Sequence, residues 1–245
     1  MVDIHCHILP GVDDGARDWE TSLAMCRIAA RDGIRHIVAT PHANDEFQYD
    51  RPRLQALLAE LHRLAAQDAQ IAATPLTFSL GCDFHLSFEN FRDALARPER
   101  YCIQGTRYLL VEFSDYVIPP NTEDLFCQLG DLGIRPIVTH PERNRILAGD
   151  LKRVLRWADE GAIIQVTANA FTGRWGKQAE KTARALMDRG AVHVVASDAH
   201  GTGSRPPLLS EARSFIAKRY GEQLASALVD ANPGAIVRGL PLPRL

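Results

Sequence analysis

The 245-residue sequence lacks the features that would tie it to nucleic acid, a membrane or secretion. Its 28 Lys and Arg residues nearly balance 30 Asp and Glu residues, so the net charge of -2 offers no basic field for nucleic acid. No apolar run reaches membrane-spanning length, and no charged segment followed by an apolar stretch resembles a signal peptide. These absences leave a small molecule or a protein as substrate and predict a cytoplasmic protein.

Cysteine is scarce and is not arranged for the usual cysteine chemistries. An odd number of cysteines without C-x-x-C spacing argues against a disulfide framework or a structural zinc knuckle. The C-x-x-x-x-x-R loop of cysteine phosphatases is also absent, because Arg107 follows Cys102 one position too early. We therefore expect small buried apolar side chains at all five positions: Cys6, Cys26, Cys82, Cys102 and Cys127.

Short β-rich runs alternate with amphipathic helical stretches along the chain. After a first strand near the N-terminus, strands are expected at 36–40, 76–80, 108–112, 135–140, 162–166 and 192–196. Helices are expected at 18–31, 52–66, 121–132, 148–160, 175–189 and 207–218. Seven such units predict one α/β domain over residues 1–245, a parallel sheet closed into a distorted, TIM-like (β/α)7 barrel. The long connection 86–104 is expected to carry an extra helix or part of a lid.

The opening fifteen residues carry a possible metal site. His5 and His7 alternate on a strand, so their side chains share one face and lie roughly 6 to 7 Å apart along the chain. Pro10 and Gly11 end the strand, and Asp13 and Asp14 follow in the loop. Histidines with nearby carboxylates suit a divalent cation.

Further potential ligands stand at the ends of later strands. The carboxyl ends of strands in a parallel barrel meet at one rim, so side chains in these positions are expected to face a common space. The complete set is His5, His7, Asp14, His42, Asp83, Glu112, His140, Asp198 and His200. Nine nitrogen and oxygen ligands exceed the needs of one ion and suit two or three.

The motifs around these residues resemble a known family. They are D-I-H-C-H at 3–7, V-D-D-G at 12–15, T-P-H at 40–42, V-E-F at 111–113, T-H-P-E-R at 139–143, S-D-A-H at 197–200 and R-P-P at 205–207. Together they resemble the PHP superfamily, the polymerase and histidinol phosphatase domains. Within it, the sequence is most similar to bacterial manganese-dependent protein-tyrosine phosphatases of capsule and exopolysaccharide operons, from Asp3 to about Pro233.

The resemblance implies a PHP fold with three metal ions and assigns the ligands to them. The first ion would be bound by His5, His7, Asp83 and Asp198, the second by Glu112, His140 and the shared Asp83, and the third by Asp14, His42 and His200. Arg143 and Arg205 correspond to the family's two functional arginines.

The sequence departs from the family's pattern at two places. Asp83 stands where relatives usually carry Glu, which would tighten or shift the metal pair or pass part of the role to His85. Ala43 and Asn44 follow His42 where a basic residue is common.

The chemistry also follows from the residue types. Clustered divalent ions supply metal-activated hydroxide near neutral pH and hold phosphate oxygens, while Arg143 and Arg205 can donate paired hydrogen bonds to the phosphoryl group. His200 or Asp198 is a candidate for protonating the leaving phenolate. Tyr116 or Phe47 is a candidate for stacking on a substrate ring.

Three functions remain open on the sequence alone. The resemblance favours hydrolysis of phosphotyrosine in proteins, with an autophosphorylated tyrosine kinase of polysaccharide export as the substrate and Mn as the metal. The same nitrogen and oxygen ligands accept Fe, Zn or Co. The alternatives are a phosphoesterase for a small metabolite such as histidinol phosphate, and a non-catalytic regulatory PHP domain.

Glu20, Arg27 and Arg31 could share an exposed face of helix 18–31, which would form either an oligomer contact or a solvated surface.

Overall fold

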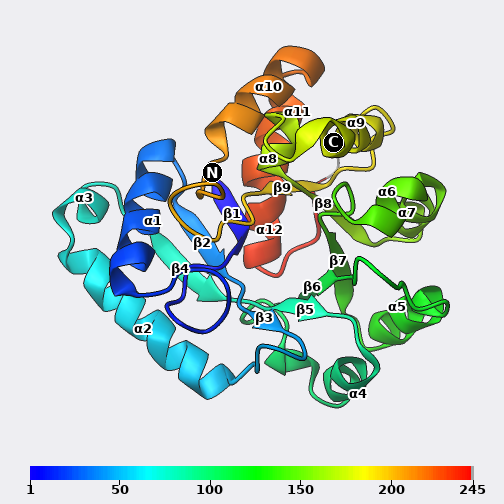
Figure 1. The fold of residues 1–245 in the computed structure, drawn as a ribbon, viewed down its shortest axis with the longest axis horizontal. Helices are drawn as coiled ribbons and strands as arrows, with labels where there is room; N and C mark the ends of the chain where they lie inside the picture. The colour runs from blue at the N-terminus through cyan, green and yellow to red at the C-terminus, as the bar shows by residue number, and fades with distance from the viewer. Residues whose placement is uncertain (244–245) are drawn as a thin grey trace.

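The computed structural model describes residues 1–243 as an α/β fold with parallel strands inside and helices outside (Figure 1). One sheet has the order β1-β2-β4, formed by β1 (Val2–Cys6), β2 (His36–Ala39) and β4 (Thr77–Leu80). The other has the order β3-β5-β6-β7-β8-β9, formed by β3 (His42–Ala43), β5 (Asp83–His85), β6 (Tyr108–Glu112), β7 (Arg135–Thr139), β8 (Ile163–Thr167) and β9 (Val194–Ala196). Every pairing within these sheets is parallel, as the alternating pattern predicts.

Two expected strands continue past a break, which is why nine strands are described where seven were predicted. Thr40 and Pro41 separate β2 from β3, and Gly81 and Cys82 separate β4 from β5. Proline cannot donate a ladder hydrogen bond, so the ladder is interrupted at Pro41. Beyond the break His42 pairs in register with Asp83, which brings these two predicted ligands side by side.

The first and last strands meet through a few specific contacts. A parallel bridge joins Cys6 to Ala199, and the Asp198 amide donates to the His5 carbonyl at 2.8 Å. The buried Asp3 carboxylate accepts hydrogen bonds from the backbone N–H and the hydroxyl of Ser197 at 3.0 and 2.5 Å. These contacts hold the segment after β9 against β1.

Two apolar layers fill the fold. Side chains from both sheets form an inner cluster with one residue of the C-terminal helix, consisting of Ile4, Val38, Ile103, Tyr108, Leu110, Ile137, Ile163, Val194, Ala196 and Ile236. A larger cluster packs the outer faces of the strands against the surrounding helices. The expectation of one parallel α/β domain is confirmed.

The helices surround the sheets, except that the last one, α12, packs Ile236 into the inner cluster. They are α1 (Trp19–Asp32), α2 (Arg51–Gln67), α3 (Ala69–Ala72), α4 (Phe88–Ala96), α5 (Thr122–Asp131), α6 (Arg145–Gly149), α7 (Leu151–Asp159), α8 (Ala168–Phe171), α9 (Gly176–Met187), α10 (Ser210–Tyr220), α11 (Glu222–Ser226) and α12 (Asn232–Val237). A 3-10 turn (Pro98–Arg100) follows α4, and a π-helical turn (Ala227–Ala231) precedes α12. The connection 86–104 therefore carries the extra helix expected of it. None of the helices within residues 1–243 combines the length and apolarity needed to cross a membrane.

Local signals set the helix limits. Asp18 caps α1 by accepting a hydrogen bond from the Thr21 amide, and Gly33 ends it with a left-handed φ of 92°. The helix expected at 148–160 is instead two helices, because Asp150 ends α6 and caps α7. On the α1 face considered for oligomer contacts, Arg27 pairs with Asp68 of the same chain at 2.6 Å.

Four of the five cysteines are buried, as expected. The exception is Cys127, which is exposed on α5, so the expectation of burial was wrong there. An amphipathic helix presents part of its surface to water, and Cys127 falls on that part.

Candidate metal centre

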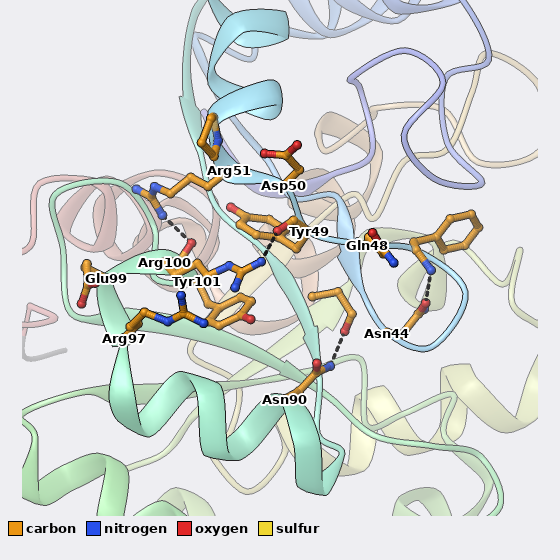
Figure 2. Close-up of a pocket in the computed structure, with 13 residues that line it drawn as sticks. Asn44, Gln48, Tyr49, Asp50, Arg51, Asn90, Arg97, Glu99, Arg100 and Tyr101 are labelled. Atoms are coloured by element: carbon orange, nitrogen blue, oxygen red, sulfur yellow. Dashed lines mark hydrogen bonds between the residues drawn. The ribbon is translucent and has the colours of Figure 1, made fainter.

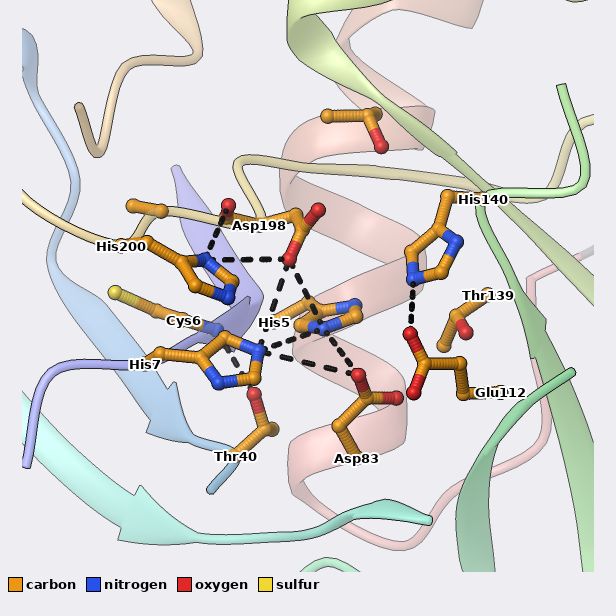
Figure 3. A network of polar contacts seen from close by, with 12 residues as sticks. His5, Cys6, His7, Thr40, Asp83, Glu112, Thr139, His140, Asp198 and His200 are labelled. Atoms are coloured by element: carbon orange, nitrogen blue, oxygen red, sulfur yellow. Dashed lines mark hydrogen bonds and ion pairs between the residues drawn. The ribbon is translucent and has the colours of Figure 1, made fainter. Parts of the chain in front are cut away.

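The nine predicted ligands converge in one cluster, and Figure 3 labels all of them except Asp14 and His42. Their nitrogen and oxygen atoms form four overlapping groups, and within each group the atoms lie within 4.8 Å of one another. The groups are His7, Asp14, His42 and His200; His5, His140 and Asp198; His5, His7 and Asp83; and His42, Asp83 and Glu112. The fold therefore gathers residues that are up to 195 positions apart in the sequence, from His5 to His200.

His5 lies at the middle of the cluster. Its Nε2 atom is 3.3 Å from Asp83 Oδ2, 3.3 Å from Asp198 Oδ1 and 3.3 Å from His7 Nε2. All four side chains are buried. Two imidazole nitrogens and two carboxylate oxygens thus point at one small space that is shielded from water.

His42 joins two parts of the cluster through its two ring nitrogens. Its Nδ1 atom lies 3.3 Å from Asp83 Oδ2 and 3.5 Å from Glu112 Oε2, while its Nε2 atom lies 3.4 Å from Asp14 Oδ1. His200 Nε2 approaches the same Asp14 oxygen at 3.3 Å. The third predicted ion therefore has a compact set of Asp14, His42 and His200.

Glu112 lies between two histidines. Its Oε1 atom is 3.6 Å from His140 Nε2, and its Oε2 atom is 3.5 Å from His42 Nδ1. His85, considered as a substitute for the shorter Asp83, has its Nδ1 atom 3.8 Å from Glu112 Oε2. The distribution of these residues among separate ions stays a prediction.

Several buried atoms of the cluster have no hydrogen-bond partner among the described residues. They are His42 Nδ1, both carboxylate oxygens of Asp83, His140 Nε2 and Asp198 Oδ1. Unpaired buried polar atoms carry a free-energy cost, and a divalent cation coordinated by nitrogen and oxygen would remove it. The residues present therefore fit bound metal ions.

Neighbouring groups turn three imidazoles so that Nε2 faces the centre. His7 Nδ1 contacts Asp13 Oδ2 at 2.8 Å, and His5 Nδ1 contacts Gln165 Oε1 at 2.9 Å. His200 Nδ1 lies 3.0 Å from the backbone carbonyl of Asp198. Such contacts fix the ring orientation of metal-binding histidines. This role of Asp13 and Gln165 was not expected from the sequence, although a glutamine on an apolar strand is a signal of it.

The electrostatics show a strongly negative centre. Burial opposes the charging of His5, but Asp83 and Asp198 outweigh it and raise the pKa of this imidazole to about 9. Burial likewise opposes the charging of His42, whose pKa is raised to about 10 by Asp14, Asp83 and Glu112. The crowded carboxylates thus attract positive charge, as a cation site requires.

The pKa of His7 is shifted in the opposite direction, below its ordinary value. Burial, assisted by the nearby His200, lowers the pKa of His7 to about 4, although Asp13 favours its charged form. Burial and the neighbouring Arg143 also hold the pKa of His140 well below its ordinary value. Neutral imidazoles are the form that binds metals.

Arg143 and Arg205 converge on a single carboxylate oxygen. Both guanidinium groups donate to Asp198 Oδ2, Arg205 at 2.8 Å. The Cζ atoms of Arg143 and Arg205 also lie 4.7 and 5.4 Å from the centroid of the Trp175 ring. The two predicted arginines therefore lie together beside the cluster, and the sequence analysis missed the tryptophan between them.

A cavity of about 1120 Å³ opens onto the cluster. Its lining includes Asp14, His42, Glu112 and His140 together with Arg143, and Tyr116 and Phe47 lie on its wall. Tyr116 is 89% exposed. The Phe47 ring lies nearly parallel to that of His42, with the two centroids 5.9 Å apart.

A second cavity of about 680 Å³ adjoins the first and shares Asn44 and Phe47 with it (Figure 2). Its arginines already have partners within its walls. Arg51 donates to the Arg100 carbonyl at 2.6 Å, and Arg100 donates to the Tyr49 carbonyl at 2.7 Å. Asp93 accepts from Arg97 and Arg100. Of these two cavities, only the larger one is lined by predicted metal ligands.

The fold and the cluster together define a class of protein. A parallel α/β fold that gathers histidines and carboxylates at the carboxyl ends of its strands is typical of metal-dependent hydrolases. A family model described as capsular polysaccharide synthesis, CpsB/CapC, matches residues 1–238. The chain belongs to the CpsB/CapC family.

Relatives of known name support this assignment. The tyrosine-protein phosphatase YwqE of Bacillus subtilis is 34% identical over 232 residues, covering 94% of this chain and 89% of the relative. The tyrosine-protein phosphatase CpsB of Streptococcus pneumoniae is 33% identical over 242 residues, covering 97% of this chain and 98% of the relative.

The fold agrees with these relatives as well. A solved structure from work on YwqE and CpsB, described as unique metal-dependent tyrosine phosphatases, superposes with a TM-score of 0.91 at 32% identity. The match covers 100% of this chain and 97% of that structure. The family expected from the sequence motifs is confirmed.

Proposed function

We propose that this chain is a metal-dependent phosphatase that hydrolyses phosphotyrosine in proteins. The observation that carries the proposal is the buried cluster of nine histidine and carboxylate side chains beside two arginines, in a chain of the CpsB/CapC family. Residues 1–245 act as one metallophosphatase domain.

The proposed ligands of three Mn ions are the nine residues of the cluster. His5, His7, Asp83 and Asp198 hold the first ion, Glu112 and His140 hold the second with Asp83, and Asp14, His42 and His200 hold the third. The ions would activate water and bind phosphate oxygens when present. Fe, Zn or Co would fit the same ligands.

Arg143 and Arg205 bind the phosphoryl group in this proposal. Each guanidinium keeps its charge and can donate paired hydrogen bonds to phosphate oxygens. Their shared contact with Asp198 holds them at the edge of the cluster, where an incoming phosphate meets both the arginines and the ions.

Neither candidate for protonating the leaving phenolate is well placed for it, because His200 binds the third ion in this proposal and its Nδ1 faces the Asp198 carbonyl. Asp198 Oδ2 accepts hydrogen bonds from both arginines, which favours the ionised carboxylate and leaves it without a proton to donate. His200 lies beside the exposed carboxylate of Asp14. Phenolate is a fair leaving group, so we expect this contribution to be small.

The proposed substrate is the tyrosine-rich tail of an autophosphorylated kinase of polysaccharide export. The open cavity with Tyr116 exposed at its wall supports a protein substrate, because a peptide can lie across it. We place this reaction in the cytoplasm. The five free cysteines, among them the exposed Cys127, support a reducing compartment.

Hydrolysis of a phosphotyrosine peptide tests the proposal. Metal-stripped protein should be inactive, and Mn should restore turnover. His42→Ala and Arg143→Ala should each lower kcat/KM by about 100-fold, through loss of metal and of the phosphate clamp. His62→Ala and Arg63→Ala, on the outer surface of α2, are the matched controls and should behave like the wild type.

Histidinol phosphate assayed alongside the peptide separates the alternatives. Selective turnover of histidinol phosphate would replace the proposed substrate with a small metabolite. Turnover of neither compound in Mn-loaded protein would overturn the enzyme proposal in favour of a regulatory domain.

A further inference from the structure

Trp175 brings the two arginines of the site together. It lies in the loop immediately before α9, on the wall of the larger cavity, and packs against the apolar core. Both the Arg143 and the Arg205 guanidinium groups lie against its ring, at 4.7 and 5.4 Å from the centroid. One indole therefore contacts two cations that arise from different loops of the fold.

The ring of Trp175 offsets part of the repulsion between the two guanidinium groups. Two guanidinium groups that donate to the same Asp198 oxygen lie close together and repel each other. The negative face of an aromatic ring attracts cations, and tryptophan does so most strongly. The indole also restricts two long side chains that would otherwise sample many rotamers.

The indole N–H does not attach Trp175 to another described residue. Trp175 Nε1 is buried and has no partner among the described residues. A buried donor without an acceptor costs free energy, which a phenyl ring in the same place would avoid. The contacts of Trp175 with the two arginines are therefore made by its aromatic ring.

We infer that Trp175 is a positioning residue that aligns Arg143 and Arg205 to receive a phosphoryl group. The inference rests on the proposed function, since it takes the two arginines as the phosphate clamp. Trp175 acts through the arginines and needs no contact with the reacting atoms.

Two substitutions at this position test the inference. Trp175→Leu keeps an apolar side chain but removes the aromatic face, and Trp175→Phe retains an aromatic face without the N–H. The readouts are kcat and KM for a phosphotyrosine peptide, the Kd of inorganic phosphate for the Mn-loaded protein by calorimetry, and the Mn content. Trp19→Leu, at the start of α1, is the control for loss of a partly buried tryptophan.

We expect Trp175→Leu to lower kcat/KM and weaken phosphate binding by about tenfold each, with unchanged Mn content. Trp175→Phe should stay within about threefold of the wild type in both readouts. In a background that carries both Arg143→Ala and Arg205→Ala, Trp175→Leu should have no further effect, because the groups that it positions are gone.

The contrary results are distinct. The positioning role would be overturned if Trp175→Leu lowered kcat/KM or phosphate binding as much in the background without the two arginines as in the wild type. A loss of bound Mn in Trp175→Leu would overturn it as well. Unchanged phosphate binding and turnover in Trp175→Leu would do the same. If wild-type protein binds phosphate without hydrolysing the peptide, the proposed function fails while phosphate binding still tests Trp175. If phosphate does not bind at all, both proposals are overturned.

Discussion

Two of the proposed ligands hold a backbone conformation that most residues avoid. His140 and Asp198 have φ angles of 33° and 51°, the positive values found for non-glycine residues in the described chain. Aspartate and histidine are found in this region more often than most residues, and strained backbone of this kind concentrates at functional sites. Each residue follows a buried strand and turns its side chain into the cluster, so the strain accompanies the placement of ligands.

Gly15 provides a test of how tightly the first loop is built. A methyl group at this position would lie 2.2 Å from the His7 carbonyl oxygen and 2.4 Å from His7 Cβ. Gly15→Ala must therefore displace His7 or Asp13, and we expect Mn affinity to fall by about 10- to 100-fold. Equilibrium dialysis with Mn measures this loss.

The control for this substitution is Gly130→Ala on α5. A methyl group there meets no atom within 4 Å, so Mn affinity should be unchanged. If Gly15→Ala bound Mn as tightly as the wild type, the close contact between this loop and His7 would not matter for the site.

The residues of the cluster could be predicted from the sequence, whereas the residues that contact them could not. His42, Asp83 and Glu112 follow or end apolar runs, and strand ends in a parallel fold share one rim. Gln165 contacts His5, and Trp175 contacts the arginines; both contacts depend on tertiary packing across the fold. A glutamine on an apolar strand marks Gln165 as unusual, but no local pattern identifies its partner or the partners of Trp175.

Glu123 links two neighbouring helices on the outside of the sheet. From α5 its carboxylate accepts hydrogen bonds from Arg153, Arg156 and the Trp157 indole of α7. Burial opposes its ionisation, but these donors lower the pKa of Glu123 to about 2. The charged carboxylate therefore stabilises the contact between α5 and α7.

We expect Glu123→Gln to lower the free energy of unfolding by about 1–2 kcal/mol at pH 7. Because the folded pKa lies below the ordinary value of 4.5, the stabilisation is complete above that pH and is lost as the pH falls towards 2. Urea unfolding of the metal-free wild type and variant measures this effect. The difference between their free energies of unfolding should be smaller at pH 4 than at pH 7. A difference that widens on acidification would contradict this account.

Element order was predictable because each element carries its own signals. Asp18 and Gly33 mark the ends of α1, and β6 occupies 108–112 as expected. The breaks after β2 and β4 were missed because Thr40-Pro41 and Gly81-Cys82 also suit simple strand ends. The helices α11 and α12 were missed because the expected pattern ended with the helix at 207–218.

The whole molecule joins the ends of the chain to build one site. Asp3 near the N-terminus binds Ser197, and Ile236 of α12 packs with Ile4 and Val194 in the inner cluster. His5 and His200, which belong to segments linked by these contacts, are both proposed ligands. Folding of the complete domain is therefore required before the cluster exists, and bound metal ions should stabilise it.

The number of metal ions bound per chain tests the central claim most directly. Metal-stripped protein should be loaded with Mn, freed of excess metal by gel filtration, and analysed for metal and protein content. Three ions per chain are expected for the wild type and for His62→Ala. His42→Ala should bind fewer, because its imidazole touches two groups of the cluster. A wild-type content of one ion or none, or a full content in His42→Ala, would contradict the proposed centre.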